Sequence, residues 1–151
     1  MSEHITKSHN KTLLLYHFVF PTKYRRKVFD DKLTKVLKET CLQKVCISLE
    51  VHFVEIWADE DHVHFLVQSV PTLSVTQIIT GIKSITARQI FHDCPEVKKI
   101  LYWWNFWTSW YYANTVWQFA NEQTIKKYVQ NQWKEYYQMH RDQLTLFEGL
   151  V

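Results

Sequence analysis

The chain has 151 residues, of which 46% are hydrophobic, and a formal net charge of +3. This length suits one domain with a substantial core, and two glycines and three prolines exclude collagen-like, repetitive and linker-rich chains. The modest charge means that any case for nucleic acid depends on local basic clusters.

Cysteine usage and apolar runs indicate the compartment. Cys41, Cys46 and Cys94 are odd in number and form no Cys-x-x-C pair, so we expect buried thiols rather than disulfides or a zinc site. The polar segment 1–11 lacks an apolar signal region, and no run reaches the roughly 18 apolar residues that span a bilayer. We therefore expect a soluble, cytoplasmic protein without a membrane partner.

A strand and a basic loop begin the ordered part of the chain. Thr12–Phe20 is rich in strand formers and ends at Pro21, which predicts the first strand. The loop that follows mixes cations with one aromatic ring, as suits a phosphate backbone with a stacked base, although a solvated loop explains it equally well. Its residues of interest are Lys23, Tyr24, Arg25, Arg26 and Lys27.

A helix and a β-hairpin come next. Asp30 and Asp31 can cap a helix whose apolar positions repeat at helical spacing. The β-branched and aromatic stretch Ser48–Trp57 predicts the second strand. The acidic segment 59–61 predicts a turn into the third strand, which would complete the hairpin.

The third predicted strand, Asp61–Val67, carries two histidines. Its polar and apolar residues alternate, which predicts one buried face. His62 and His64 are two residues apart and therefore share the other face. Two adjacent imidazoles on a rigid strand form part of a metal site, although an isolated His-x-His is often only a hydrogen-bonded pair.

A second helix begins after Pro71, with Ser74 as its cap. Its isoleucines form a buried stripe, and Lys83 and Arg88 lie off that stripe, where they can meet either a phosphate or solvent. The aromatic stretch Trp110–Phe119 predicts the last strand.

The last predicted helix, capped by Asn121, carries a tyrosine and a glutamine on one face. Tyr128 and Gln132 are four residues apart, one above the other. A phenol can attack phosphorus, and a carboxamide oxygen can complete a metal site begun by two histidines. Taken alone, Tyr128 is better explained as a core aromatic in the apolar stripe of this helix.

The order of these elements predicts the fold. Strand, helix, strand, strand, helix, strand, helix is the split βαβ pattern of an α+β, ferredoxin-like fold. We expect an antiparallel sheet with helices on one face, the first and third strands at its centre, and a C-terminal helix bearing the tyrosine. One domain would cover residues 1–151, with its core at 12–133 and a tail at 134–151.

Together these stretches resemble the small single-tyrosine HUH (His-hydrophobic-His) transposases of bacterial and archaeal insertion sequences, a superfamily that includes REP-associated tyrosine transposases. The matching blocks, in order, are Lys23–Val28, Asp61–His64, Lys83–Arg88, Asn105–Val116 and Tyr128–Gln132. The chain departs from the family where Ser84 and Thr86 replace a usual Gly and Ser, and where Trp103-Trp104 replaces a frequent Gly-Gly.

The resemblance implies cleavage and rejoining of single-stranded DNA through a 5′-phosphotyrosine, during transposition of an insertion sequence. It implies Tyr128 as nucleophile and Mg²⁺ or Mn²⁺ as cofactor, held by His62, His64 and Gln132. The DNA contacts it implies are Lys23, Tyr24, Arg25, Arg26, Lys27, Lys83 and Arg88. The expected partners are DNA hairpins at element ends and a second copy of the chain, with active sites shared between subunits.

Three alternatives stay open on the sequence. One is a domesticated relative that acts on chromosomal repeats, and another is a non-catalytic module that binds single-stranded nucleic acid on a ferredoxin-like sheet. A phosphoesterase with two His-x-[Ser/Thr] motifs is disfavoured, because only His4-Ile5-Thr6 fits that pattern.

Overall fold

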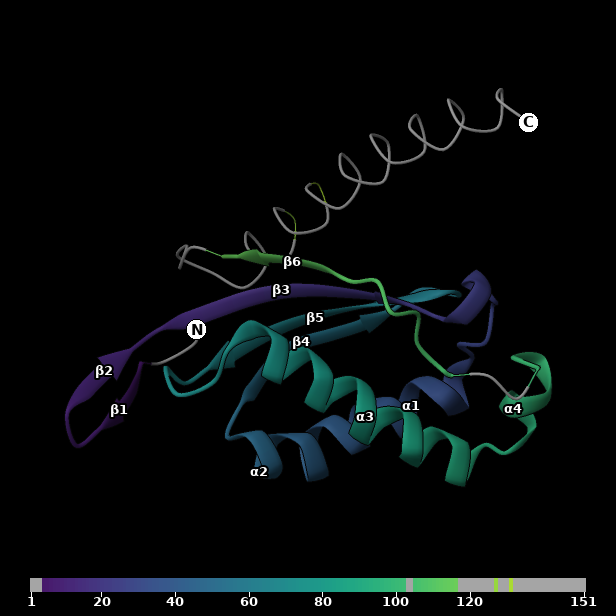
Figure 1. The fold of residues 1–151 in the computed structure, drawn as a ribbon, viewed down its shortest axis with the longest axis horizontal. Coiled ribbons are helices and arrows are strands. Elements are labelled where there is room, and N and C mark those ends of the chain that lie inside the picture. Colours follow the sequence, from purple (N-terminus) through teal and green to yellow (C-terminus); the bar gives the residue numbers. More distant parts are fainter. Residues whose placement is uncertain (1–3, 103–104, 117–126, 128–130, 132–151) are drawn as a thin grey trace. The chain divides into compact units, whose positions relative to one another are not determined.

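The protein is built around a four-stranded antiparallel sheet (Figure 1). The structure, a computed structural model, describes residues 4–102, 105–116, 127 and 131. The strands of this sheet are β3 (Leu14–Pro21), β4 (His52–Ala58), β5 (His62–Ser69) and β6 (Tyr112–Thr115). Their order, β4-β5-β3-β6, places β3 and β5 at the centre, as the sequence predicts. With helices in both crossovers this is the split βαβ arrangement, so the predicted fold class is confirmed.

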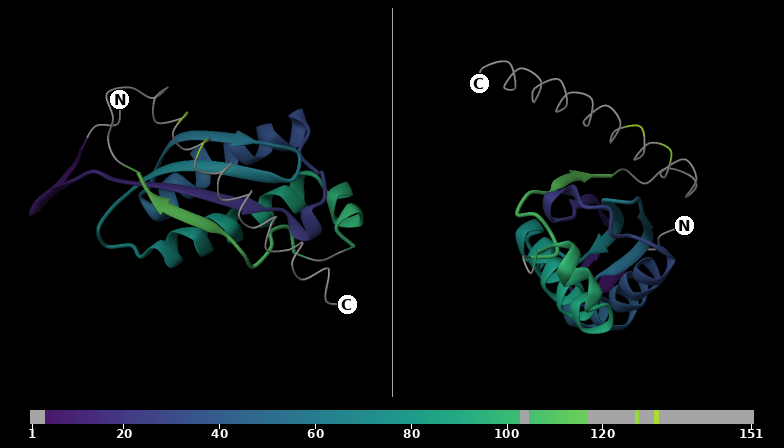
Figure 2. Two further views of the ribbon diagram at one scale, coloured as in Figure 1. Left: turned by 90° about the horizontal axis from the view of Figure 1, so that it is seen from above. Right: turned by 90° about the vertical axis from the view of Figure 1, so that its right-hand side faces the viewer.

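The helices cover one face of the sheet (Figures 1 and 2). They are α1 (Asp31–Thr40), α2 (Cys46–Leu49), α3 (Val75–Asp93) and α4 (Glu96–Ile100). The predicted caps are present: Asp30 accepts a hydrogen bond from Leu33 N at 2.8 Å, and Ser74 forms a capping box with Gln77. These caps fix where α1 and α3 begin, and so which residues face the sheet.

The register of the strands assigns alternate residues to opposite faces. Phe18, Phe20 and Phe65 face the helices and belong to the core, as do the neighbours Val63 and Val67, which confirms the predicted buried face of the third strand. The opposite face of the central strands is polar but also buried. Its residues at most 2% exposed include His17, His64, Leu66 and Gln68.

The segment before β4 differs from the prediction. Ser48 and Leu49 belong to α2 rather than to a strand, because a π-helical turn, Cys41–Val45, carries the helical chain onward from α1. Glu50, with φ of 52°, ends the helix. Leu49 then packs against α3 at Gly81, where an added Cβ would come within 2.7 Å of Leu49 Cδ1.

The two ends of the chain also differ from the prediction, and part of the C-terminal end lies outside the described residues. The polar N-terminus forms a hairpin of β1 (Ile5–Lys7) and β2 (Asn10–Thr12), which the sequence analysis does not predict and which extends past the main sheet (Figure 1). The last strand occupies only Tyr112–Thr115 of the predicted Trp110–Phe119, of which 117–119 lie outside the described residues. Within the described residues, no helix has the length and apolar character needed to cross a bilayer.

Candidate metal centre

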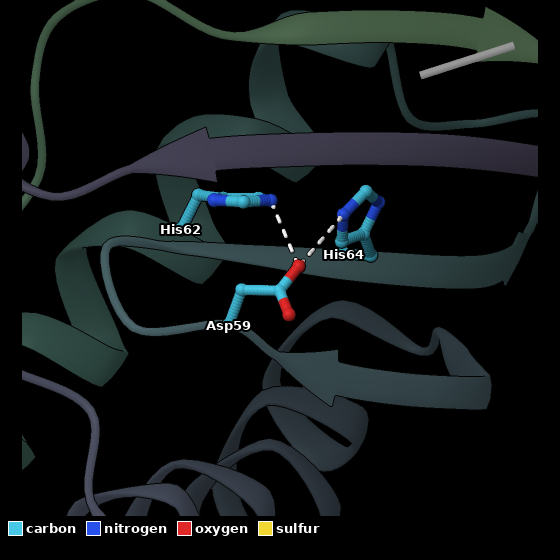
Figure 3. A group of neighbouring side chains, drawn as sticks. All are labelled: Asp59, His62 and His64. Atoms are coloured by element: carbon cyan, nitrogen blue, oxygen red, sulfur yellow. Dashed lines mark ion pairs between the residues drawn. The ribbon is translucent and has the colours of Figure 1, made fainter. Parts of the chain in front are cut away.

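Three side chains with metal-ligating atoms converge where β4 turns into β5. His62 and His64 project from β5 on the same face, as predicted, and Asp59 reaches them from the turn (Figure 3). Asp59 Oδ2 lies 3.0 Å from His62 Nε2 and 3.7 Å from His64 Nε2, and the three candidate ligand atoms lie within 4.8 Å of one another. The hairpin thus gathers one carboxylate and two imidazoles at a single point.

This donor set fits a divalent cation. Imidazole nitrogens and a carboxylate oxygen are ligands that first-row divalent metals accept, and the carboxylate also suits Mg²⁺. The Asp59 side chain is 59% exposed, so a hydrated cation can approach from its side. The structure therefore contains a candidate site for a divalent metal.

His62 is held by a charged chain of residues. The Asp61 carboxylate accepts a hydrogen bond from His62 Nδ1 at 2.7 Å, and Arg25 Nε donates to the same carboxylate at 3.1 Å. Burial alone would raise the pKa of Asp61, but the hydrogen bonds from His62 and Arg25 outweigh it and lower that pKa. With Nδ1 donating to Asp61, the Nε2 atom of His62 is directed toward Asp59, and a cation between them would take its lone pair.

His64 is held by neutral, buried rings. Its Nδ1 lies 3.1 Å from Nε2 of His17 on β3, and the two rings are nearly parallel, with 5° between their planes. Trp57 on β4 stacks on His64 with ring centroids 4.8 Å apart. Burial lowers the pKa of His64 to about 2 and that of His17 to about 3, so both rings are neutral at neutral pH.

The basic loop docks beside the candidate metal site. Thr22 N donates to Asp61 O at 2.9 Å and Val28 N to Glu60 O at 3.0 Å, which ties the loop to the β4–β5 turn. Tyr24 and Arg25 both have positive φ, 58° and 52°, a costly conformation for residues with a Cβ. This backbone course directs Arg25 to Asp61.

Most of the predicted DNA-contacting cations already have protein partners. Besides the Arg25–Asp61 pair, Arg26 lies over the ring of Tyr102, 5.1 Å from its centroid, and Lys27 pairs with Glu60 at 2.7 Å. Tyr24 is exposed, with the Lys23 ammonium 5.4 Å from its ring centroid.

Lys23, Lys83 and Arg88 line one pocket of about 580 Å³ between α3 and residues 105–111. Its walls include the aromatic residues Phe91, Phe106, Trp107 and Tyr111. Lys83 Nζ donates to the carbonyl oxygens of Thr108 at 2.8 Å and Trp110 at 3.0 Å, and burial lowers its pKa to about 8. The fold therefore gathers three of the predicted cations, while the rest of the basic loop does not line this pocket.

Two predicted site residues, Tyr128 and Gln132, lie outside the described residues, as do Asn121 and Trp103-Trp104. Lys127 and Asn131, which precede them, are helical and exposed. The prediction that Tyr128 and Gln132 complete the site therefore stays a prediction.

Three residues of the site were missed by the sequence analysis: Asp59, His17 and Trp57. Asp59 was interpreted only as part of a turn, although it is the acidic residue three positions before the first histidine. His17 offered a signal, because it is a polar residue inside an otherwise apolar strand, where a buried polar group needs a partner. No signal singles out Trp57 among seven tryptophans.

The fold and this site define a protein of the ferredoxin-like α+β class with a candidate divalent-metal centre on a central strand. The chain belongs to the family described as "Transposase IS200 like", whose profile matches residues 10–132. It is therefore a transposase of the IS200 type, which agrees with the resemblance seen in the sequence.

Relatives across most of the chain carry the same description. The ISDra2 transposase TnpA of Deinococcus radiodurans is 31% identical over 123 residues, covering 79% of this chain and 84% of the relative. The transposase for insertion sequence element IS200 of Salmonella typhimurium is 27% identical over 135 residues, covering 89% of this chain and 87% of the relative.

Solved structures support the fold. A crystal structure from Deinococcus radiodurans that is assigned as a transposase superposes with a TM-score of 0.68 at 26% identity, covering 85% of this chain and 97% of that one. A REP-associated tyrosine transposase, solved bound to a REP hairpin, gives a TM-score of 0.52 at 13% identity, covering 82% of this chain and 68% of that one. At that identity the second likeness concerns the fold alone.

Proposed function

We propose that this transposase cleaves and rejoins single-stranded DNA through a covalent bond to Tyr128. The observation that carries the proposal is the convergence of His62, His64 and Asp59 at the β4–β5 turn, on the strand that the HUH resemblance assigns to the metal. The resemblance supplies the remaining parts: Tyr128 as nucleophile and Gln132 as a further metal ligand.

Mg²⁺ or Mn²⁺ is the proposed cation. His62 and His64 would supply imidazole nitrogens and Asp59 a carboxylate oxygen, a mixed donor set that suits Mn²⁺, with Mg²⁺ favoured by its abundance in cells. The cation, when bound, polarises the scissile phosphate and aligns it for in-line attack.

The covalent step balances without a nucleotide cofactor. The Tyr128 oxygen bonds to phosphorus as the phenol gives up its proton, the bond from phosphorus to the 3′ oxygen breaks, and that oxygen leaves as a 3′-hydroxyl after taking a proton. The strand is then joined to the protein as a 5′-phosphotyrosine, which conserves the energy needed for rejoining. A phenol has a pKa near 10, so either the nearby metal or a basic neighbour such as Lys127 would assist it.

The basic loop and the pocket are the proposed DNA-contacting surfaces. The pocket between α3 and residues 105–111 is lined by Lys23, Lys83 and Arg88. These cations can contact phosphates, and the aromatic walls beside them can stack on bases. Exposed Tyr24 offers a stacking face beside the remaining loop cations, Arg25, Arg26 and Lys27. Hairpins at the ends of an insertion sequence are the proposed substrate.

The experiment is to incubate the protein with pooled single-stranded hairpin DNAs and Mn²⁺, and to look for a covalent protein–DNA band on a denaturing gel. Tyr128→Phe should abolish the band but preserve DNA binding, whereas the matched control Tyr24→Phe should still form it. A band that persists in Tyr128→Phe would refute the nucleophile. Binding without a band under any metal would favour a non-catalytic module.

A homodimer with shared active sites is also proposed, because one tyrosine holds one cleaved strand and excision requires cuts at both element ends. Mixing Tyr128→Phe protein with His64→Ala protein tests it. If each site combines the tyrosine of one subunit with the histidines of the other, the mixed dimer has one intact site, and cleavage returns. A mixture that stays inactive although tagged subunits exchange would rule out sharing.

A further inference from the structure

The buried pair of His17 and His64 joins the two central strands on the face opposite the helices. His17 is diagonal to His64 in the β3–β5 register, since His17 lies opposite Leu66 and His64 opposite Val19. The two rings share one hydrogen bond, at 3.1 Å, and His17 is fully buried. Sequence and family comparison give no role to His17.

The chemistry of two neutral imidazoles allows only two arrangements of this bond. In the first, His64 Nδ1–H donates to His17 Nε2, and the Nε2 atom of His64 keeps a free lone pair. In the second, His17 Nε2–H donates to His64 Nδ1, and the Nε2 atom of His64 carries a proton. Only the first arrangement lets His64 ligate a cation through Nε2, the atom that faces Asp59.

We propose that His17 is a positioning residue, which accepts the Nδ1–H of His64 and so holds its Nε2 lone pair toward the metal. The inference rests on the metal site proposed above. His17 helps to fix the orientation of the ring in both states, because the bond links two strands and Trp57 stacks on His64, and it holds the ligating tautomer when a metal is bound.

The same geometry predicts that the pair changes its tautomers when a metal binds. His17 Nδ1 is buried and has no hydrogen-bond partner among the described residues. Buried N–H groups without a partner are rarer in proteins than buried acceptors without one, so we expect the metal-free protein to favour the second arrangement, in which Nδ1 carries no proton.

With a cation on His64 Nε2, the proton of that atom would be released to solvent and the bridging proton would lie on His64 Nδ1, while His17 Nδ1 would take up a proton from solvent. The pair keeps two protons throughout. Asn114 lies opposite His17 on β6, so its side chain is on the same face of the sheet.

Nitrogen-15 NMR of histidine-labelled wild-type protein tests the proposal without any variant. With Zn²⁺ as a diamagnetic probe, both His64 and His17 should be protonated at Nδ1, and the metal-free spectrum should show both protonated at Nε2. A His17 ring that carries its proton on Nε2 while Zn²⁺ is bound to His64 cannot be an acceptor, and would overturn the proposal.

Calorimetry of Mn²⁺ binding gives a second readout. His17→Leu removes the acceptor but keeps a side chain of similar size, and should weaken Mn²⁺ binding about 10- to 100-fold, the usual effect of losing such a partner. His17→Gln should recover most of the affinity, because an amide oxygen can accept the same bond. His52→Leu, which replaces an exposed histidine on β4, should leave the affinity unchanged.

The outcomes separate this inference from the proposed metal site. A folded His17→Leu protein that binds Mn²⁺ within twofold of wild type would overturn the role of His17 alone. A His64→Ala protein that binds as tightly as wild type would overturn the metal site, and the role of His17 with it.

Discussion

His62 and His64 are two residues apart on one strand, yet their surroundings are of opposite kinds. His62 lies at the strand end, next to the turn, where Asp61 and the partly exposed Arg25 form a charged chain behind it. His64 lies deeper, between β3 and β4, where a neutral imidazole and an indole surround it. His62 is oriented by a charged hydrogen bond at the strand end, and His64 by packing and a neutral hydrogen bond.

The difference shows that the two histidines of one His-x-His strand can meet two separate requirements of a metal site, a fixed geometry and a connection to the surrounding loop. A charged hydrogen bond is strong but responds to salt and to nearby phosphates, whereas a buried neutral bond is insensitive to both. The basic loop, which we propose to contact DNA, connects to His62 through the Arg25–Asp61 pair. His64 would thus fix the geometry of the site, and His62 would couple it to the loop.

The largest effect should come from removing each histidine. His62→Ala and His64→Ala should both abolish Mn²⁺ binding by calorimetry, because each removes one of the few protein ligands. Their free energies of unfolding should differ. His64→Ala empties a buried site and should lose about 2 to 4 kcal/mol, whereas His62→Ala, whose side chain is 12% exposed rather than 2%, should lose about 1 to 2 kcal/mol.

Urea denaturation in the presence of a chelator measures this difference without any contribution from bound metal. Equal losses of stability in the two variants would mean that burial does not distinguish the two histidines. Undiminished Mn²⁺ affinity in both would refute the site itself.

The shared face of His62 and His64 could be predicted from the sequence, but the hydrogen bonds of His62 and Arg25 to Asp61 could not. Alternation on the third strand places His62 and His64 on one face, and the acidic stretch before them predicts a turn. The strand order also follows from the order of elements, because the split βαβ pattern leaves few alternatives. These inferences are local or topological, which is the information that residue spacing carries.

The surroundings of His64 could not be predicted from the sequence. Its bond to His17 and its stack with Trp57 join residues far apart in the chain, and they depend on the register of β3 and β4 against β5. Spacing along one strand says nothing about register between strands. The π-helical turn at Cys41–Val45 was missed for a related reason, since the packing of Leu49 on Gly81 favours continued helix over the strand propensity of Ser48–Trp57.

A smaller effect should follow from neutralising the carboxylate behind His62. Asp61→Asn can still accept the Nδ1–H of His62, but without charge, so Mn²⁺ affinity should fall about tenfold, the lower end of the range for such partners. Glu60→Gln is the matched control, because it neutralises the neighbouring acid of the same turn, which pairs with Lys27 instead. Similar losses in the two variants would indicate a general loss of negative charge rather than the bond to His62.

The smallest effect should come from Arg25, which acts on His62 only through Asp61. The Arg25–Asp61 pair is partly exposed, and such pairs contribute at most about 1 kcal/mol, so Arg25→Gln should weaken Mn²⁺ binding by no more than about fivefold. Arg26→Gln, the control, removes the adjacent cation, which lies over Tyr102, and should change nothing. The decisive comparison is a double-mutant cycle: in an Asp61→Asn background, Arg25→Gln should cause no further loss, because the carboxylate through which it acts is gone. Additive losses would show that Arg25 influences the metal site by a route other than Asp61, and the charged chain behind His62 would then not be a single unit.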